Sequence, residues 1–408
     1  MKIDPGPIDL GRAQQALEKV KDPFLLWEYK TDDSFVSNPT PGPDGIYVNT
    51  GSSQWKSDHM GSVHKLDDEG QLQWKFDTRG GVRSAPTPWQ SRLYVNSDWG
   101  NFYALDSSDG HLLWQAEKQE GDFRCSPAVD DQGNAYGLST SFEYFERGVA
   151  TPVAKLVKLK AESGQVAWSK TFTGGMSPDD AAPVLGPGGT VLLAAEKALV
   201  CLDQQSGEER WRFPLEGRGG RPIVSGQRIL IGSIGNDERH LVRAIEAGGK
   251  ELWSFENKDV LGHNIPSLAL DEAAGNLFVG DWGKSVYCVD ANTGAEKWAR
   301  QPGGYGAFKP AVGAEGEVYF AGGRTEKFHV FDAKTGDNRW NFVGGSRLAQ
   351  VPLHHHEIVY VAAEGRLVAL AEDALARKLE AMKAVPQGPE LQLDENLLTI
   401  GDISIEVR

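Results

Sequence analysis

The stretch YALDSSDGHLLW, residues 103–114, contains the spacing that decides the fold. Asp106 stands four residues before Gly110, and Gly110 stands four residues before Trp114. The same spacing recurs in VCLDQQSGEERW ending at Trp211, YCVDANTGAEKW ending at Trp298 and HVFDAKTGDNRW ending at Trp340. A spacing that recurs this often indicates a repeated structural unit rather than a single site.

The repeat extends along most of the chain. In the set of eight repeat tryptophans, seven follow a glycine at four residues and the eighth has no such glycine, and successive members of the set lie 40 to 54 residues apart. This is the period of a four-stranded propeller blade. We interpret these tryptophans as structural, because chemistry is not normally repeated eight times in one chain. They are Trp27, Trp74, Trp114, Trp168, Trp211, Trp253, Trp298 and Trp340.

Each unit has the same internal order. A proline opens it, two runs rich in β-branched and aromatic residues follow, and the Asp–Gly turn then leads into the tryptophan strand, as expected for strands bounded by turns. We label the four strands A to D, with A directly after the proline. The prolines are Pro39, Pro86, Pro127, Pro183, Pro222, Pro266, Pro310 and Pro352.

The residue types of the motif suit a tight turn between strands C and D. The aspartate can accept hydrogen bonds from backbone amides of the turn. The glycine supplies the positive φ that such a turn requires. The indole is expected to fill the gap between neighbouring blades. Lys160 and Glu246 stand where aspartate is expected, so those two turns should be looser.

The number of units predicts how the ring closes. The unit opened by Pro352 lacks a D strand, whereas the stretch around Trp27 is a D strand with no unit before it. If the strand of Trp27 completes the blade begun at Pro352, no strand edge is left unpaired. The sequence therefore predicts an all-β, eight-bladed propeller of four-stranded antiparallel blades, closed by its N-terminal strand.

The motif resembles the repeats of the pyrroloquinoline-quinone-type (PQQ-like) propeller family, best matched by residues 289–298 and 332–340. The resemblance covers about residues 23–372 and implies eight blades docked by their tryptophans. It is similar to the non-enzymatic scaffold propellers of the bacterial outer-membrane assembly machine. The resemblance also implies an alternative function, that of a quinoprotein dehydrogenase. In such enzymes the quinone is held in the channel with a calcium or lanthanide ion, an aspartate base and usually a disulfide between adjacent cysteines.

Composition limits the partners. The net charge of −15 argues against nucleic acid and against an anionic bilayer. The start of the chain has no apolar run typical of a secretion signal, and three separate cysteines fit a reducing compartment, so we expect a cytoplasmic protein without a membrane span. The cysteines are Cys125, Cys201 and Cys288.

Two extensions flank the predicted propeller of residues 23–372. Residues 1–22 form an N-terminal arm with an amphipathic stretch. Residues 373–385 have helical spacing, and residues 386–408 form a linker and a tail resembling a β-hairpin, with alternating Ile403, Ile405 and Val407. Either these extensions pack on the propeller, or the tail adds to the sheet edge of a partner.

One face of the propeller is the candidate site. The long, glycine-rich D–A loops and the B–C loops should share a face, at which cationic residues next to the prolines ring the mouth of the central channel. Aromatic and arginine residues are enriched in interface hot spots, although they could equally cover blade edges and pair locally. The candidate partner-binding residues are Trp55, Trp99, Trp282, Arg83, Arg124, His263, Lys309, Phe142, Tyr144 and Phe145.

Other chemistry is less well supported. His354, His355 and His356 fall in a predicted A–B turn on the opposite face, and adjacent residues of an extended chain point to opposite sides, so we expect neither a metal site nor a cofactor. No catalytic constellation stands out, and fold alone licenses no chemistry. We therefore expect a monomeric, non-enzymatic scaffold that binds a protein. The alternatives are a quinoprotein-type oxidoreductase or a propeller that binds a peptide or carbohydrate.

Overall fold

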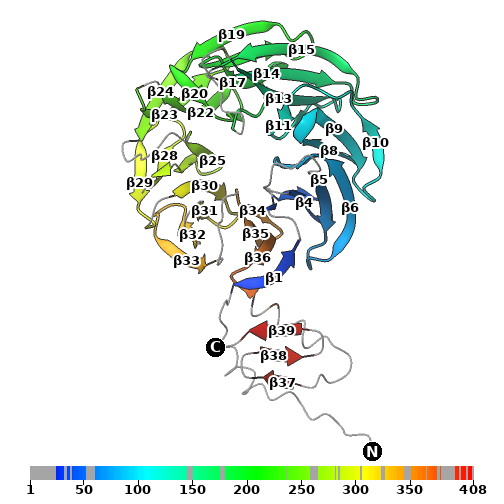
Figure 1. Ribbon diagram of the computed structural model, residues 1–408. Coiled ribbons are helices and arrows are strands. Elements are labelled where there is room, and N and C mark those ends of the chain that lie inside the picture. The colour runs from blue at the N-terminus through cyan, green and yellow to red at the C-terminus, as the bar shows by residue number, and fades with distance from the viewer. Residues whose placement is uncertain are drawn as a thin grey trace, which may run out of the picture.

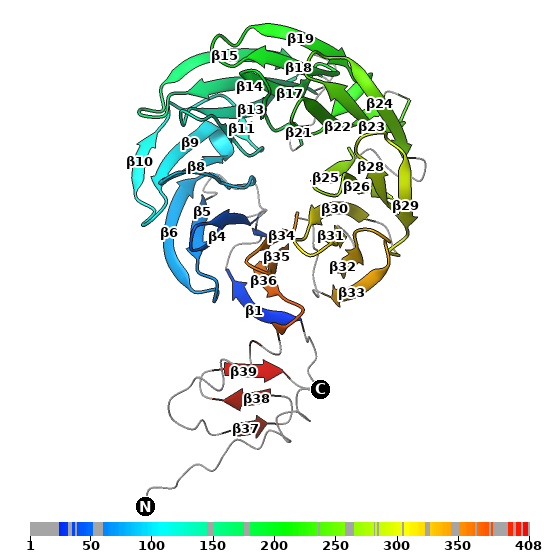
Figure 2. The same cartoon turned by 180° about the vertical axis from the view of Figure 1, so that it is seen from behind.

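The structure is a computed structural model. It describes residues 24–406 except for 32–34, 37–38, 52–59, 145–149, 175–179, 236, 258–264, 281, 284, 304–305, 323–326, 344–350, 364, 375–376, 378–390, 395–396 and 401–402. Eight antiparallel sheets follow one another around a ring (Figure 1), and the view from behind shows the same order reversed (Figure 2). The chain is therefore an eight-bladed propeller, as the repeat predicted.

The first four blades come from the first half of the chain. Within each of these four blades the strands follow one another from the ring axis outward in sequence order. Blade 1 contains β2 (Phe35–Val36), β3 (Thr40–Gly42), β4 (Gly45–Gly51), β5 (Met60–Leu66) and β6 (Leu72–Arg79); blade 2 contains β7 (Thr87–Trp89), β8 (Arg92–Ser97), the 3-10 turn η1 (Asp98–Gly100), β9 (Asn101–Asp106) and β10 (Leu112–Gln115); blade 3 contains β11 (Asp122–Phe123), β12 (Ala128–Val129), β13 (Ala135–Tyr144), β14 (Ala150–Leu159) and β15 (Val166–Thr173); blade 4 contains β16 (Val184–Gly186), β17 (Thr190–Ala195), β18 (Ala198–Asp203) and β19 (Glu209–Pro214).

The other four blades complete the ring. Blade 5 contains β20 (Gly217–Gly219), β21 (Ile223–Ser225), β22 (Arg228–Gly235), β23 (His240–Glu246) and β24 (Glu251–Asn257); blade 6 contains β25 (Ser267–Asp271), β26 (Asn276–Gly280), β28 (Val286–Asp290) and β29 (Glu296–Arg300); blade 7 contains β27 (Trp282–Gly283), β30 (Gly306–Val312), β31 (Glu317–Gly322), β32 (Lys327–Asp332) and β33 (Asn338–Val343); blade 8 contains β34 (Leu353–His355), β35 (Ile358–Ala363), β36 (Arg366–Leu370) and β1 (Leu25–Lys30). In blades 1, 3 and 5 the innermost strand is split into two segments that pair with the same B strand, a division that the sequence pattern did not predict.

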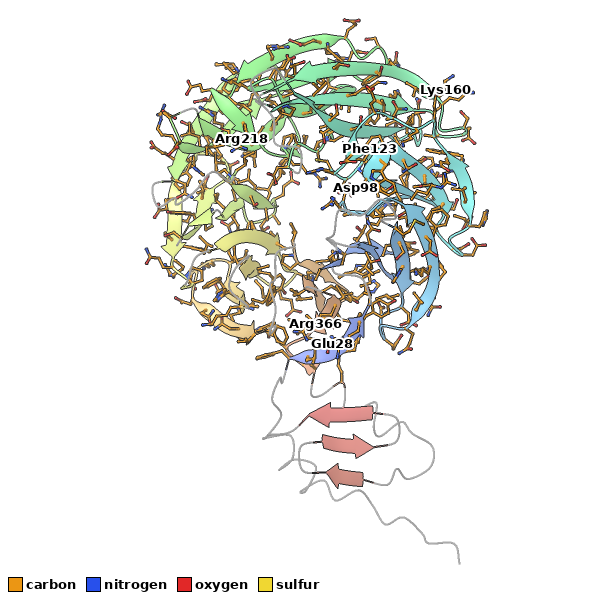
Figure 3. The ribbon with its side chains drawn as sticks, viewed as in Figure 1. Glu28, Asp98, Phe123, Lys160, Arg218 and Arg366 are labelled. Carbon is orange, nitrogen blue, oxygen red and sulfur yellow. The ribbon has the colours of Figure 1, made fainter. Side chains whose placement is uncertain are left out.

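The closure of the ring is confirmed. The N-terminal strand β1 pairs antiparallel with β36, and Trp27 lies opposite Ala369 in this register. An ion pair between Glu28 Oε1 and Arg366 Nη1, 2.8 Å long, joins the same two strands (Figure 3). Blade 8 is therefore made from both ends of the propeller sequence, which leaves no unpaired edge at this seam.

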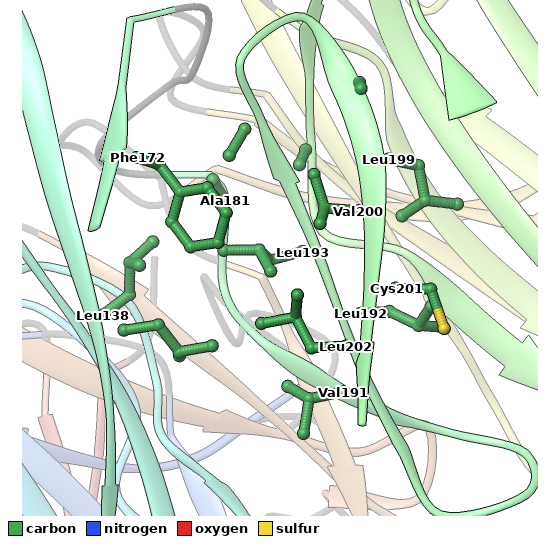
Figure 4. Close-up of a cluster of buried hydrophobic side chains, with 14 of the residues drawn as sticks. Leu138, Phe172, Ala181, Val191, Leu192, Leu193, Leu199, Val200, Cys201 and Leu202 are labelled. Carbon is green, nitrogen blue, oxygen red and sulfur yellow. The ribbon is translucent and has the colours of Figure 1, made fainter. Parts of the chain in front are cut away.

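Hydrophobic side chains between neighbouring blades form the core. In the largest cluster, Leu138 and Phe172 of blade 3 pack against Leu193 and Val200 of blade 4 (Figure 4), all with little or no solvent exposure. Alternate residues of each B and C strand thus face one neighbouring blade or the other, which explains why these strands are buried along nearly their whole length. Such strands read as continuous apolar runs in the sequence.

The repeat motif joins one blade to the next. At Asp106 the carboxylate accepts the amide of Ser108 at 2.8 Å, as predicted for the turn. The glycine does more than supply a positive φ, because an added Cβ would lie 2.5 to 3.0 Å from the indole of the preceding blade in all seven copies. The pairs are Gly70 with Trp27, Gly110 with Trp74, Gly164 with Trp114, Gly207 with Trp168, Gly249 with Trp211, Gly294 with Trp253 and Gly336 with Trp298.

The two turns without aspartate are closed by main-chain hydrogen bonds like the others, although the turn at Glu246 is one residue shorter than the turn at Asp106. Gly164 N donates to Lys160 O at 2.9 Å, the length of the corresponding bond from Gly110 to Asp106. The turn at Glu246 is closed by a 2.8 Å bond from Gly249. The predicted loosening is therefore wrong for the backbone, since the carboxylate adds bonds to a turn that the main chain already closes.

Beyond blade 8, the tail forms a small separate sheet. Strands β37 (Leu391–Asp394), β38 (Leu397–Ile400) and β39 (Ile403–Glu406) are antiparallel neighbours and lie outside the ring (Figure 1). The predicted hairpin corresponds to β38 and β39, and β37 is an addition. The predicted arm at 1–22 and most of the predicted helix at 373–385 lie outside the described residues. In the described part of the chain, no helix has the length and apolarity to span a membrane.

Candidate functional site

The D–A and B–C loops lie together on one side of the ring, here called the loop face. The amide of Asp98, in the B–C loop of blade 2, donates to Gly81 O in the preceding D–A loop at 2.9 Å. The A–B and C–D turns share the other side, here called the turn face, where Ser107 N donates to Ser91 O at 2.9 Å. The assignment of loops to faces made from the sequence is therefore confirmed.

The structure brings three of the candidate residues together on the loop face. Arg83, Trp99 and Arg124 come from blades 2 and 3, and two aspartates join them. Of the other candidates, Trp55, His263 and Phe145 lie outside the described residues, and only the backbone is described for Phe142, Tyr144, Trp282 and Lys309.

An ion pair holds the first of these residues. Arg83 Nε lies 2.9 Å and 3.2 Å from the two carboxylate oxygens of Asp98. Asp98 is only 3 % exposed and lies on the inner side of the ring (Figure 3). Burial raises the pKa of this carboxyl, the charge of Arg83 acts to lower it, and the net shift is upward. A buried carboxylate that is paired in this way is costly to separate from its partner.

The next residue, Trp99, is held in a strained backbone conformation. Its φ is 63°, a region that a bulky side chain occupies only when its surroundings impose it. Asp122 of blade 3 does this, since its Oδ1 accepts the Trp99 amide at 2.9 Å. The following Gly100 is equally constrained, because an added Cβ would lie 1.8 Å from Gln119 O. The half-buried indole is thus presented from a rigid turn.

Asp122 also binds the third candidate. Its Oδ2 lies 3.5 Å from Arg124 Nη2, so one carboxylate connects the backbone of Trp99 to the side chain of Arg124. Arg124 lies between the two inner segments β11 and β12 of blade 3. Two blades are therefore locked together under this part of the loop face.

A series of buried hydrogen bonds lies next to the cluster and supports it. Ser84 Oγ donates to Asn96 Oδ1 at 2.6 Å, and Asn96 Nδ2 donates to Cys125 O at 2.9 Å. Asn49 of blade 1 donates from Nδ2 to Ser84 O. These bonds connect the inner strands of three consecutive blades, so the loops above them rest on a fixed base.

Sequence reasoning missed Asp98, Asp122 and the two asparagines. A signal was present for three of them. Asp98 precedes the tryptophan in SDWG, a pattern that returns as GDWG at 280–283, and Asn49 and Asn96 end the repeated stretch Tyr-Val-Asn. Asp122 has no such signal, because its role depends on the loop of a neighbouring blade.

The inner side of blade 5 presents another cation. Arg221, directly before Pro222, lies between β20 and β21. Its side chain is exposed, yet the surrounding protein desolvates it enough to lower the pKa of its guanidinium. Both observations fit a position on a concave surface near the ring axis, as the sequence predicted for residues at this point of the repeat.

Two backbone pairings place further candidate residues on the loop face. Trp282 in β27 pairs with Ala307 of β30, the strand that also carries Lys309. A B–C loop of blade 6 thus extends the inner edge of blade 7. In blade 3, Phe142 and Tyr144 lie opposite Pro152 and Ala150 in the β13–β14 hairpin.

The three consecutive histidines lie on the turn face, as predicted. His354 stacks on Tyr319 of blade 7, with ring centroids 5.9 Å apart. His356 instead approaches blade 1, where its Nδ1 lies 3.1 Å from Asp68 Oδ2. Their imidazoles therefore serve two different blade contacts. In the part of the chain that the structure describes, the only three potential metal ligands with converging atoms are Asp106, Asp109 and His111 of an exposed turn.

Comparisons with known proteins agree with this architecture. A family model described as outer membrane protein assembly factor BamB matches residues 25–141, 154–280 and 238–373. The BamB of Moranella endobia is 22% identical over 271 residues, which cover 62% of this chain and 66% of that protein. The crystal structure of BamB from Moraxella catarrhalis is similar with a TM-score of 0.65, at 14% identity, over 85% of this chain and 99% of that one.

Enzymes are also among the similar proteins. The quinohemoprotein alcohol dehydrogenase ADH-IIG of Pseudomonas putida is 25% identical over 298 residues, 63% of this chain and 39% of the enzyme. The serine/threonine-protein kinase AfsK of Streptomyces griseus is 28% identical over 186 residues, 40% of this chain and 21% of the kinase. The chain thus spans less than half the length of either enzyme.

Proposed function

The chain belongs to the family described as outer membrane protein assembly factor BamB, and from this premise we propose that it is a non-enzymatic scaffold that binds a protein partner through its loop face. One observation carries the proposal: the Trp99 indole is presented from a strained turn that Asp122 holds at 2.9 Å. The BamB relatives are named as assembly factors, and a factor of this kind acts by contact with other proteins.

The chemistry of the cluster favours recognition over catalysis. A general acid or base needs an ionisable group that can reach a reacting atom. Here the carboxylate of Asp98 is engaged by Arg83, and that of Asp122 by Trp99 N and Arg124. The ionisable groups thus fix one another in place, as suits a preorganised binding surface.

The same rigidity supports affinity. Tryptophan and arginine supply most of the binding energy in many interfaces, and a side chain that is already ordered loses less entropy on binding. Trp99 and Arg124 are held by a single carboxylate, so a partner would meet an aromatic group and a cation at a fixed spacing. The neighbouring pair of Arg83 and Asp98 adds polar contacts at its edge.

The second candidate is an oxidoreductase of the quinoprotein type, favoured by the match to ADH-IIG. The residues present do not fit the quinone site that this resemblance implies. The three cysteines are buried and lie in three different blades, 3, 4 and 6, so they supply no pair of adjacent cysteines for a disulfide. The carboxylate of Asp98 on the inner side of the ring is bound to Arg83.

Affinity capture with the full chain tests the scaffold proposal. Wild type and the Trp99→Ala and Arg124→Ala variants are used as bait in the native cell. We expect a partner recovered by wild type to be reduced about tenfold or more by either variant, the effect of one hot-spot residue. Leu113→Ala is the matched control, since Leu113 is 40% exposed on β10 of the same blade.

Two outcomes would oppose the proposal. Equal recovery of every partner by wild type and the Trp99→Ala variant, with both proteins folded by circular dichroism, would remove the loop face as the binding surface. A saturable absorbance change on titration with pyrroloquinoline quinone and Ca²⁺ would favour the oxidoreductase instead.

A further inference from the structure

A pocket of about 400 Å³ lies at the seam between blades 7 and 8, on the turn face. It is bounded by the A–B turns of both blades, by Trp340 of β33 and by the segment that follows β36. This volume is sufficient for a small ligand or a long side chain. The pocket lies on the opposite face from the Trp99 cluster, so it is independent of the proposed function.

The way the ring closes explains why the pocket is there. The other seven repeat tryptophans each pack against the glycine of the C–D turn in the next blade. Blade 8 has no such turn, because its outer strand β1 comes from the N-terminus. Trp340 is instead stacked by Phe24, with ring centroids 4.3 Å apart. Its Nε1 donates to Glu372 Oε1 at 2.9 Å rather than to a backbone carbonyl.

The lining of the pocket is acidic. Five carboxylates face it, and two arginines offset part of their charge. Arg339 pairs with Glu317 at 2.7 Å, and Arg377 pairs with Glu357 at 2.9 Å and with Asp373 at 2.7 Å. The remaining two, Glu315 and Glu372, have no ion pair within the described part of the chain, which leaves the pocket with an excess of negative charge.

The hydroxyl of a buried tyrosine is the second, independent observation. Tyr319 lines the pocket and is only 4% exposed. Its hydroxyl makes no hydrogen bond to the residues that the structure describes and is not among the fully buried atoms, so it opens into the pocket. Burial and the charges of Glu317 and Glu372 raise the pKa of this phenol, so the group stays neutral and polar. A ligand that donates to this oxygen would therefore gain a hydrogen bond that the protein itself does not supply.

The arrangement of the carboxylates distinguishes an organic cation from a metal ion. A metal ion needs several ligand atoms within a few ångströms of one another. The only such group within the described residues is Asp106, Asp109 and His111 in blade 2, far from this seam along the ring (Figure 1). The pocket carboxylates are instead spread around aromatic rings and the apolar Val359.

We propose that this pocket binds an ammonium group carried on an apolar stem, as in a lysine side chain or a free diamine. An ammonium has three donors and no acceptor, which matches the carboxylates of Glu315 and Glu372 and the oxygen of Tyr319. The apolar stem can pack against Val359 and Trp340, which also line the pocket.

Calorimetric titration of the full chain tests this site. The probes are cadaverine and N-acetyl-lysine methylamide, and the matched neutral probe is N-acetyl-norleucine methylamide, which lacks the ammonium. We expect saturable binding of at least one ammonium probe, weakened by salt, and none of the neutral probe. Binding of cadaverine alone indicates a free amine as the natural ligand, whereas binding of the lysine amide indicates a side chain of a partner.

Two conservative variants locate the site. Tyr319→Phe removes only the hydroxyl, and Glu372→Gln keeps an acceptor for Trp340 while removing the charge. Each variant should weaken binding of the probe about tenfold, the effect of losing one charge-assisted contact. The control variant Glu208→Gln, which changes an exposed carboxylate on the turn of blade 4, should bind the probe as wild type does. Unchanged binding by both pocket variants, or no saturable binding by wild type, would overturn the proposal.

Discussion

The Cα of Gly336 lies directly against the indole of Trp298 in the preceding blade. A Cβ at this position would come within 2.7 Å of the indole Cδ2, and the φ of Gly336 is 72°. The glycine therefore satisfies two separate requirements, a left-handed turn in its own blade and close approach of the preceding blade. The indole Nε1 also donates to Ala333 O in the same turn at 3.0 Å.

The two requirements can be separated by substitution. Gly336→Ala should lower the free energy of unfolding by about 2–4 kcal/mol, because the methyl group adds a steric conflict to the cost of a positive φ. The control is Gly226→Ala, which has a φ of 58° but no atom within 4 Å of the added Cβ. That variant should lose about 1 kcal/mol. Equal losses in denaturant unfolding would show that the indole contact contributes nothing.

The seam predicts a second effect on stability. Deleting residues 1–30 removes β1, which pairs with β36 and brings Trp27 into contact with blades 8 and 1. We expect a lower melting temperature and concentration-dependent aggregation, because the edge of β36 becomes unpaired. The matched control is deletion of residues 1–22, which keeps β1. If the protein without residues 1–30 melts at the same temperature as wild type, closure of the ring by β1 is ruled out.

The sequence predicted the ring because its evidence is local. Aspartate, glycine and tryptophan of one motif lie in a single hairpin, so their spacing is set by that hairpin alone. The contact of Gly336 with Trp298 joins different blades, and no spacing within one unit reveals it. For the same reason Asp122 escaped notice, since its partner Trp99 lies in the neighbouring blade.

The pocket at the seam could not be predicted for a different reason. It arises where the repeat is incomplete, so it depends on a turn that blade 8 does not have. The sequence showed that this blade lacks its own outer strand, and it placed Trp27 there correctly. The sequence could not show that Phe24 occupies the position next to Trp340, because the two residues lie far apart in the chain.

A buried carboxylate predicts how stability depends on pH. Burial acts to raise the pKa of Asp130, but hydrogen bonds from Asn134 and Tyr136 outweigh it, and the net shift is below the ordinary 3.8. Its contribution to stability is therefore present above pH 3.8 and is lost as the pH falls through the lower folded-state pKa. Gln204 of blade 4 also donates to Asp130, at 3.2 Å.

Asp130→Asn should accordingly destabilise the protein by about 1–3 kcal/mol at pH 7. The difference from wild type should shrink as the pH falls below 3.8, because wild type then loses the same interactions. Urea unfolding at several pH values measures this, with the exposed neighbour in Asp131→Asn as control. A difference that stays constant down to the acid limit would show that the charge of Asp130 is not involved.

The last prediction concerns Asp122, whose two oxygens have different partners. Oδ1 accepts the amide of Trp99 at 2.9 Å, and Oδ2 lies 3.5 Å from Arg124 Nη2. Asp122→Asn keeps an oxygen for the amide and removes the charge, whereas Asp122→Ala removes both. If the partner recognises the rigid turn, the asparagine variant should capture the partner nearly as well as wild type. The alanine variant should then recover about tenfold less of it.

Hydrogen exchange gives a readout that does not depend on the partner. The Trp99 amide should exchange faster in the Asp122→Ala variant than in the Asp122→Asn variant, because only the former leaves it without an acceptor. If both variants lose capture equally while only the alanine variant exchanges faster, the charge of Asp122 and its pairing with Arg124, rather than the fixed turn, would determine binding. The loop face would then act through electrostatic complementarity, and the fixed turn at Trp99 would not be the feature that the partner recognises.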